Sequence, residues 1–158
     1  YRVRVLGRGP LEHSWKKIAT KLGVAERITW MGWLPHQEAL QQFDWADVLA
    51  FTSLRDTSGN VMLEALSQGV PVICLNHQGA ADIVTDGCGI KIPVTTPSSV
   101  ISGISQAIQQ LWESPDKLLR LSINALNRAR EYLWTRQGDK MLTVYQRAVG
   151  DGFLWSRR

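Results

Sequence analysis

The sequence predicts an α/β fold, in which a Rossmann-like parallel sheet of about five or more strands carries helices on both faces. Two observations lead to this fold class. Short apolar runs alternate with helical patterns from Val3 to Pro93, and such alternation implies parallel strands joined by right-handed crossovers. Most of the apolar runs are continuous, as in strands covered on both faces. With 158 residues, 44% of them hydrophobic, the chain is large enough to bury a sizeable core.

Strand character is found in five short segments. They are residues 3–6, 28–31, 48–52, 72–75 and 90–92. Apolar residues at helical spacing predict helices between these strands, and Gly23 and Gly69 are placed to end two of them. The predicted helices of this part of the chain are residues 11–22, 37–43, 60–68 and about 80–84.

Beyond Pro93 the pattern becomes helical throughout. Ile, Leu and Ala recur at helical spacing in residues 98–113 and 116–133, and Pro115 between them is tolerated in the first turn of a helix. A third helix is expected over about residues 136–149. We expect these helices to pack against the sheet and its edge, so that residues 1–150 form one domain. Residues 151–158 lack periodicity and are expected to be a tail.

The composition narrows the class of protein. No apolar run approaches the roughly 20 residues of a transmembrane helix. The spacing of Cys74 and Cys88 fits neither a metal site nor a redox motif, which favours reduced, mostly buried thiols in a cytosolic protein. The chain starts at Tyr1 and runs at once into a predicted strand, so we expect it to begin inside a longer protein.

The whole chain has a net charge of +4, and its basic residues are concentrated in the N-terminal part. A solvated face, an anionic ligand and a peripheral contact with an anionic membrane surface all remain open as explanations. Nucleic acid is not expected as a partner, because no aromatic-interleaved basic motif or helix-turn-helix pattern accompanies the charge. The residues concerned are Arg2, Arg4, Arg8, Lys16, Lys17, Lys21 and Arg27.

The segment from Ser53 to Gly69, SLRDTSGNVMLEALSQG, carries the most chemical information. It follows the most apolar predicted strand, and ligands of open parallel sheets bind beyond the carboxyl ends of the strands. Gly59 lets the backbone approach a ligand, and the N–H groups of Asn60 and Val61 at the start of the next helix can hold a phosphate. This segment therefore predicts a binding site for a phosphorylated ligand.

Two carboxylates flank this helix start. Asp56 precedes the helix and Glu64 lies within it, at a separation that could place both around one ligand. Ordinary capping by Asp56, Thr57 and Ser58, with Glu64 on a solvated face, explains the same residues. The apolar neighbours of Glu64 favour a ligand there, because they leave its carboxylate poorly solvated and in need of a hydrogen-bond donor.

These motifs resemble one family when they are taken in order. The segment from Asp56 to Glu64 resembles the E-x7-E motif of the family 4, or group 1, retaining glycosyltransferases of GT-B fold. VRVLGRGP resembles the second strand and glycine turn of the donor-binding domain of that family, ITWMGWLP its next strand and base-binding loop, and DVLAFTS the strand before the motif. The resemblance extends over nearly the whole chain, as far as Leu133, Trp134 and Tyr145.

The resemblance implies one half of a GT-B enzyme, the C-terminal donor-binding domain, with a nucleotide-diphosphate sugar as donor substrate and no cofactor or metal ion. Asp56 would be the catalytic-site residue that contacts hydroxyls of the transferred sugar. Glu64 would accept hydrogen bonds from the ribose hydroxyls, which suits an acceptor-only carboxylate. The amides of Gly59, Asn60 and Val61 would meet the sugar or the diphosphate.

The resemblance also implies contacts between the donor and two loops in the N-terminal part of the chain. Gly7 and Gly9 would let the first loop approach the donor, although core packing at a tight strand-to-helix turn explains both glycines nearly as well. Residues 31–34 would lie beside the base. His77, which follows the predicted strand 72–75, is a candidate donor to phosphate or to the acceptor, whereas His13 and His36 are expected at the surface.

The sequence departs from the family pattern in two ways. Asp56 is one methylene shorter than the usual Glu, and Thr57-Ser58 replaces the frequent Gly-Phe. The Arg and Lys that neutralise the leaving diphosphate in the family belong to a segment just before Tyr1, and Arg8 does not stand at their position. We therefore expect residues 1–158 to be inactive by themselves.

The sequence thus predicts a hexosyl-type transferase that moves a sugar to a hydroxyl acceptor with retention of configuration, in the cytoplasm or peripheral to the inner face of the membrane. A separate N-terminal domain would bind the acceptor, which is a glycan, a lipid or a small molecule. A sugar-nucleotide epimerase, a phosphorylase of the same architecture and a non-catalytic nucleotide-binding domain remain alternatives. A dehydrogenase module is disfavoured, because Glu12 stands where its third glycine would be.

Overall fold

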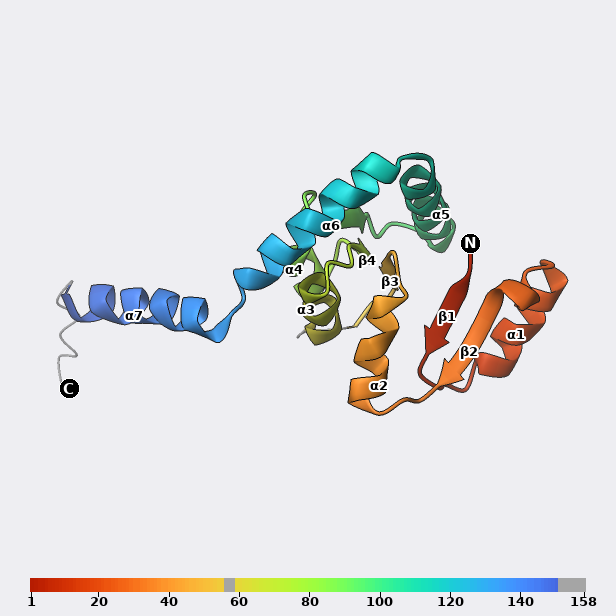
Figure 1. The fold of residues 1–158 in the computed structure, drawn as a ribbon, viewed down its shortest axis with the longest axis horizontal. Coiled ribbons are helices and arrows are strands. Elements are labelled where there is room, and N and C mark those ends of the chain that lie inside the picture. Colours follow the sequence, from red (N-terminus) through yellow and green to blue (C-terminus); the bar gives the residue numbers. More distant parts are fainter. Residues whose placement is uncertain (56–58, 151–158) are drawn as a thin grey trace. The chain divides into compact units, whose positions relative to one another are not determined.

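The computed structural model describes residues 1–55 and 59–150 (Figure 1). The chain divides into two compact units, Tyr1–Trp45 and Ala46–Arg158. Each unit is a parallel α/β arrangement of its own and is described by itself. The predicted division between a domain of residues 1–150 and a tail of residues 151–158 stays a prediction, since the tail lies outside the described residues.

The first unit holds two parallel strands, β1 (Val3–Leu6) and β2 (Ile28–Gly32), joined through helix α1 (Glu12–Lys21). A short helix, α2 (His36–Gln41), follows β2 and continues as a 3₁₀ turn. The parallel register pairs Val3 with Ile28 and shifts between Val5 and Leu6. Arg4 ties the strand pair to the end of the unit, because its guanidinium lies 4.0 Å from the ring centroid of Trp45 and donates to Gln42 Oε1 at 2.8 Å.

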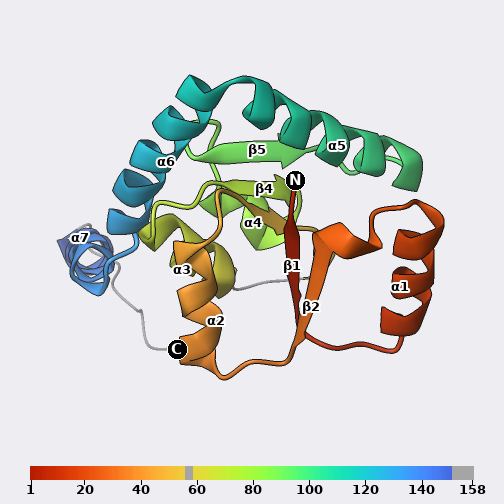
Figure 2. The same ribbon diagram turned by 45° about the vertical axis from the view of Figure 1, so that its right-hand side comes forward.

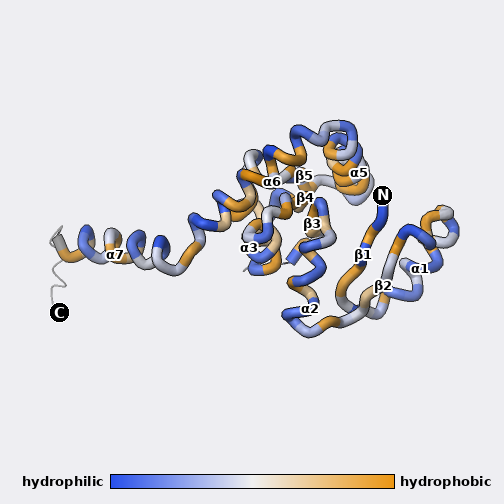
Figure 3. Tube along the Cα trace, in the orientation of Figure 1, coloured by the Kyte–Doolittle hydropathy of each residue, from blue (hydrophilic) through white to orange (hydrophobic). Residues whose placement is uncertain are grey.

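The second unit holds a three-stranded parallel sheet in the order β3-β4-β5. Its strands are β3 (Leu49–Phe51), β4 (Val72–Leu75) and β5 (Gly89–Ile92), connected by α3 (Asn60–Ser67) and α4 (Gln78–Ile83). Three longer helices follow: α5 (Pro97–Glu113), α6 (Pro115–Arg130) and α7 (Trp134–Gly150). Figure 2 shows α5 running along β5, and Figure 3 shows hydrophobic and hydrophilic residues alternating along α7.

The central strand β4 organises the core of the second unit. All four of its residues are buried. Ile73 and Leu75 pack with Ile92 and with residues of α5 and α6, whereas Val72 and Cys74 point to the other face because side chains alternate along a strand. Right-handed crossovers from β3 to β4 and from β4 to β5 put α3 and α4 on that other face. A strand covered on both faces reads as a continuous apolar run, which is how β4 was predicted.

The five predicted strands and the seven predicted helices are all present, with small differences at their ends. Helix α5 starts at Pro97 because Thr96 caps it: its side chain accepts from Ser99 N while the Ser99 hydroxyl accepts from Thr96 N. Within the described residues, hydrogen bonds join β1 to β2 in the first unit and β3, β4 and β5 in the second. Apolar runs identify strands but carry no information on which strands become neighbours.

Both cysteines are free and buried, as the sequence predicted. Burial raises the pKa of Cys74 to about 11, with Lys91 opposing part of the shift. Within residues 1–55 and 59–150, no helix is both long and apolar enough to cross a bilayer.

Candidate functional site

The turn that begins α3 is built around Gly59. Its φ of +62° lies in the left-handed region, and its carbonyl accepts from the N–H groups of Met62 at 2.9 Å and Leu63 at 3.3 Å. A Cβ at this position would lie 2.5 Å from Ile83 Cδ1 and 2.7 Å from Met62 Cε. The left-handed backbone conformation therefore accounts for glycine here, and any Cβ would also displace the ends of the Ile83 and Met62 side chains. The close approach of a ligand to this turn stays a prediction.

Asn60 and Val61 form the first turn of α3 at the carboxyl end of β3. The N–H groups in the first turn of a helix have no carbonyl four residues earlier within the helix, and the helix dipole makes this end positive. Ligands of open parallel sheets bind at this edge. Asn60 is exposed and Val61 is partly buried, so the turn has an accessible side.

Glu64 lies one turn after Asn60, so both side chains project from one face of α3. The opposite face is closed: Met62, Ala65 and Leu66 have no exposed surface. Glu64 itself is partly buried rather than fully solvated. The geometry thus brings a helix start and a carboxylate together on the accessible side of α3, and their contacts with a ligand stay predictions.

Asp56 lies outside the described residues, together with Thr57 and Ser58. Its role at the sugar stays a prediction. The loop that leads to it is described as far as Arg55, whose N–H donates to the Ser53 hydroxyl at 3.3 Å.

Gly7 and Gly9 lie in the loop between β1 and α1, in the first unit. Gly7 has a φ of +104° and its N–H donates to the Gly32 carbonyl at 2.7 Å, so a backbone requirement accounts for this glycine. Gly9 has no such requirement. A Cβ at either position would meet nothing within 4 Å, which excludes core packing within the described residues as the reason for either glycine. Their proposed approach to a donor stays a prediction.

Arg8, one of the N-terminal basic residues, also lies in this loop. Its side chain lies against Gly32, the last residue of β2: a Cβ on Gly32 would lie 3.1 Å from Arg8 Nε. Gly32 has a φ of +67°, and the neighbouring Trp33 is 70% exposed. The segment predicted to lie beside a base therefore presents an exposed aromatic ring. No sequence motif indicated the position of the Arg8 guanidinium.

The loop after β4 lies at the carboxyl edge of the same sheet as the start of α3. His77 is exposed and precedes α4, and the N–H of Asn76 donates to the Ile92 carbonyl at 2.8 Å. Gln78 has a φ of +48°, an uncommon conformation for a residue with a side chain, and such conformations are held by the surrounding structure. Sequence reasoning missed Gln78, because glycine is the usual sign of a left-handed residue.

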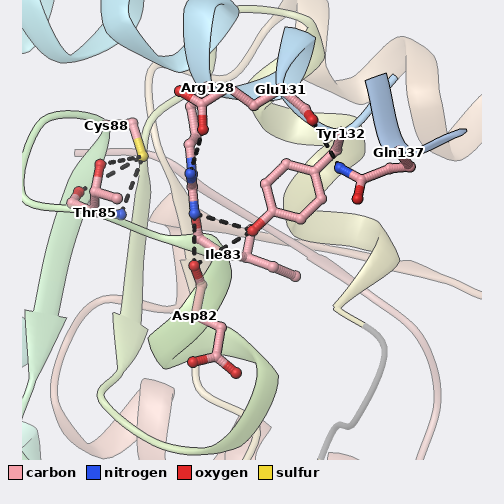
Figure 4. A network of polar contacts seen from close by, with 8 residues as sticks. All are labelled: Asp82, Ile83, Thr85, Cys88, Arg128, Glu131, Tyr132 and Gln137. Atoms are coloured by element: carbon pink, nitrogen blue, oxygen red, sulfur yellow. Dashed lines mark hydrogen bonds and ion pairs between the residues drawn. The ribbon is translucent and has the colours of Figure 1, made fainter. Parts of the chain in front are cut away.

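A polar network holds the end of α4 (Figure 4). The guanidinium of Arg128 donates to the carbonyls of Asp82 and Ile83, at 2.7 and 2.8 Å. The Tyr132 hydroxyl lies 3.0 Å from Arg128 Nη2, and Arg128 also pairs with Glu131. Within the described ranges, no three His, Cys, Asp or Glu side chains come together as a metal site would require.

Parallel strands with a glycine turn and a helix start at their carboxyl edge are typical of domains that bind nucleotides and other phosphorylated ligands. The chain belongs to the glycosyl transferases group 1, which it matches over residues 1–128. Its fold is that of the GT-B glycosyltransferases, and it is consistent with their C-terminal donor domain. The family resemblance read from the sequence is thereby confirmed.

Curated relatives include D-inositol 3-phosphate glycosyltransferase 1 of Catenulispora acidiphila, which is 28% identical over 86% of this chain and 32% of its own length. Putative glycosyltransferase EpsD of Bacillus subtilis is 26% identical over 91% of this chain and 36% of its own. The chain thus spans about a third of the length of these relatives.

Solved structures share the fold. HepE of Anabaena, in a complex with UDP, superimposes with a TM-score of 0.73 at 23% identity, over 92% of this chain and 41% of HepE. The pneumococcal O-GlcNAc transferase GtfA, in complex with UDP and GlcNAc, gives a TM-score of 0.76 at 17% identity, over 95% of this chain and 29% of GtfA.

Proposed function

We propose that this chain is the donor-binding domain of a hexosyl-type glycosyltransferase that uses a nucleotide-diphosphate sugar and retains the anomeric configuration. The observation that carries the proposal is the accessible face of α3, which combines a helix start at Gly59 with a carboxylate at Glu64. The solved structures of HepE and GtfA with UDP support a nucleotide donor.

Each group has a separate task in this proposal. The N–H groups of Asn60 and Val61 bind the diphosphate, whose negative charge the positive end of α3 stabilises. That stabilisation matters most as the diphosphate departs, because its charge grows in the transition state. Glu64 accepts hydrogen bonds from the ribose hydroxyls, and Asp56 contacts the transferred sugar. The protein thus acts by positioning and by electrostatic stabilisation.

The remainder of the enzyme completes the site. Since the chain spans about a third of its curated relatives, we propose that the acceptor hydroxyl is bound by a domain outside residues 1–158. Residues 1–158 alone should then bind donor without transferring sugar.

We also propose that transfer needs no metal ion and takes place in the cytoplasm. Activity of the complete enzyme that disappears in EDTA and returns with manganese would contradict the metal-independent mechanism.

A specific feature of α1 favours a peripheral membrane contact as well. Leu11, Trp15, Ile18 and Leu22 recur at helical spacing on one face and are 52–68% exposed. Lys17 and Lys21 lie on the same helix and are also exposed. An apolar face combined with lysines is typical of helices that lie in the headgroup region of an anionic bilayer. We propose that this face, called the α1 stripe, contacts such a surface.

The experiment that tests the donor function is a titration of residues 1–158 with UDP, GDP and ADP, followed by ¹⁵N-resolved NMR. We expect one of these diphosphates to shift the amide resonances of Gly59, Asn60 and Val61. The matching nucleoside, which lacks the diphosphate, should leave the three amides nearly unchanged. If no diphosphate shifts them at millimolar concentration, the α3 site is wrong.

A further inference from the structure

Arg128 joins α6 to the last turn of α4. The two carbonyls that it binds, those of Asp82 and Ile83, are the final carbonyls of α4 and have no N–H partner within that helix. Nε donates to Ile83 O at 2.8 Å and Nη2 donates to Asp82 O at 2.7 Å. Arg128 follows Ile83 by 45 residues, so this C-cap is a tertiary contact.

The Arg128 side chain has little freedom at this position. It is only 20% exposed, and its guanidinium carbon lies 4.9 Å from the centroid of the Tyr132 ring. Arg128 Nη1 also pairs with the Glu131 carboxylate, and Nη2 also donates to the Tyr132 hydroxyl, as Figure 4 shows. A planar donor fork held on several sides fixes the carbonyls that it binds more rigidly than a single flexible donor would.

The Ile83 side chain contacts the start of α3, so the position of Ile83 affects that turn. Its side chain is 6% exposed, and its Cδ1 lies where a Cβ of Gly59 would collide with it. Gly59 is the N-cap of α3, directly before the amides of Asn60 and Val61. The contacts therefore run from Arg128 through Ile83 to the Gly59 turn, all within the second unit.

We propose that Arg128 is a positioning residue for the Gly59 turn: by fixing the end of α4 it holds Ile83 against Gly59 and so sets where the first amides of α3 meet a diphosphate. The part that concerns the ligand rests on the proposed donor function. A small displacement of binding groups weakens a ligand considerably, so loss of this restraint should reduce diphosphate affinity by about fivefold to fiftyfold.

The variants separate the restraint from charge and from general stability. Arg128→Gln removes the fork, and Arg128→Lys keeps the charge but cannot donate to both carbonyls in the same geometry. Arg130→Gln is the matched control, since Arg130 lies on the same helix, is exposed, and its guanidinium makes a long 3.4 Å contact with Asn127 Oδ1. Ile83→Val leaves both Arg128 hydrogen bonds in place but shortens the side chain that contacts Gly59.

Two readouts are measured on residues 1–158: the amide resonances of Gly59 and Asn60 without ligand, and the affinity of the folded protein for UDP well below its Tm. We expect Arg128→Gln and Ile83→Val to shift both amides and weaken UDP binding, Arg128→Lys to give an intermediate effect, and Arg130→Gln to change neither. If Arg128→Gln fails to fold, Arg128→Lys and Ile83→Val decide the same question.

One result would contradict the positioning role of Arg128. A lower Tm of the Arg128 variants with unchanged Gly59 and Asn60 amides and unchanged UDP affinity would overturn the proposal, because Arg128 would then only stabilise the fold. Failure of the donor function looks different. In that case the parent protein would bind neither UDP nor the other diphosphates, while the amide shifts would still support the hold of Arg128 on the turn.

Discussion

The side chain of Ile83 lies against the backbone of Gly59, so that a Cβ on Gly59 would be 2.5 Å from Ile83 Cδ1. This contact joins the end of α4 to the start of α3, the two helices that follow neighbouring strands on one face of the sheet. It also places a tightly packed apolar residue directly behind the turn that carries the proposed diphosphate-binding amides. The consequences of changing either residue follow from this packing.

Gly59→Ala should destabilise the protein by about 2–4 kcal/mol. Roughly 1–2 kcal/mol comes from a side chain in the left-handed region, and the rest from overpacking against Ile83. Gly69→Ala is the matched control, because Gly69 has a φ of +75° but its Cβ would make only ordinary contacts of 3.4 Å or more. Urea unfolding measures both. Equal losses for the two variants would contradict the packing role of Ile83.

Glu64→Gln should weaken nucleoside diphosphate binding by about tenfold to a hundredfold, since hydrogen bonds to a charged acceptor contribute roughly 1.5–3 kcal/mol. Calorimetric titration of residues 1–158 measures the affinity. Glu113→Gln serves as control, because Glu113 is an exposed residue at the end of α5. Parent-like binding by Glu64→Gln would show that Glu64 does not hold the ribose.

Asp56→Asn in the complete enzyme should lower turnover while leaving binding of free nucleoside diphosphate nearly intact. A group that meets only the sugar has no contact with a ligand that lacks one, and a contact that strengthens in the transition state appears in kcat. Steady-state kinetics and diphosphate titration are the two measurements. Asp56→Glu restores the reach of the usual family residue and should shift donor-sugar preference.

Helix capping makes the opposite forecast for Asp56. Asn caps a helix about as well as Asp, so a purely capping residue would tolerate Asp56→Asn in every assay. Kinetics identical to the parent for both Asp56 variants would remove this residue from the site.

The Cys74 thiol should make stability depend on pH in the alkaline range. Its pKa is raised in the folded protein, from 9.0 to about 11, so the protonated thiol favours the folded state. This contribution is fully present below pH 9 and is lost as the pH rises towards 11, with a size of about 2 kcal/mol. Urea unfolding at several pH values measures it. Cys74→Ala should lose less stability than the parent between pH 9 and 11, and parallel curves for the two proteins would contradict the shift.

Vesicle binding tests the α1 stripe. We expect residues 1–158 to sediment with vesicles that contain phosphatidylglycerol, and binding to fall by about tenfold when Trp15 and Ile18 are both changed to Ser. Lys17→Glu with Lys21→Glu should abolish the preference for anionic over neutral vesicles. If the complete enzyme does not bind these vesicles while residues 1–158 do, another part of the protein covers the stripe and the membrane contact is wrong.

The sequence by itself determined which segments become strands and helices, because hydrophobic periodicity and capping residues act locally. A continuous apolar run located β4, and the segment from Gly59 to Glu64 located the start of α3 and the carboxylate that follows it. Family membership followed from the order of these motifs. Asp56 is also a sequence assignment, since it lies outside the described residues.

Only the tertiary structure decided how these elements restrain one another. Three features depend on contacts between residues far apart in the chain. They are the pairing of the strands, the packing of Ile83 against Gly59 and the C-cap supplied by Arg128. Such contacts leave no periodic signal in a single sequence. An arginine that caps a helix 45 residues earlier reads, in the sequence, as one more charge on an amphipathic helix.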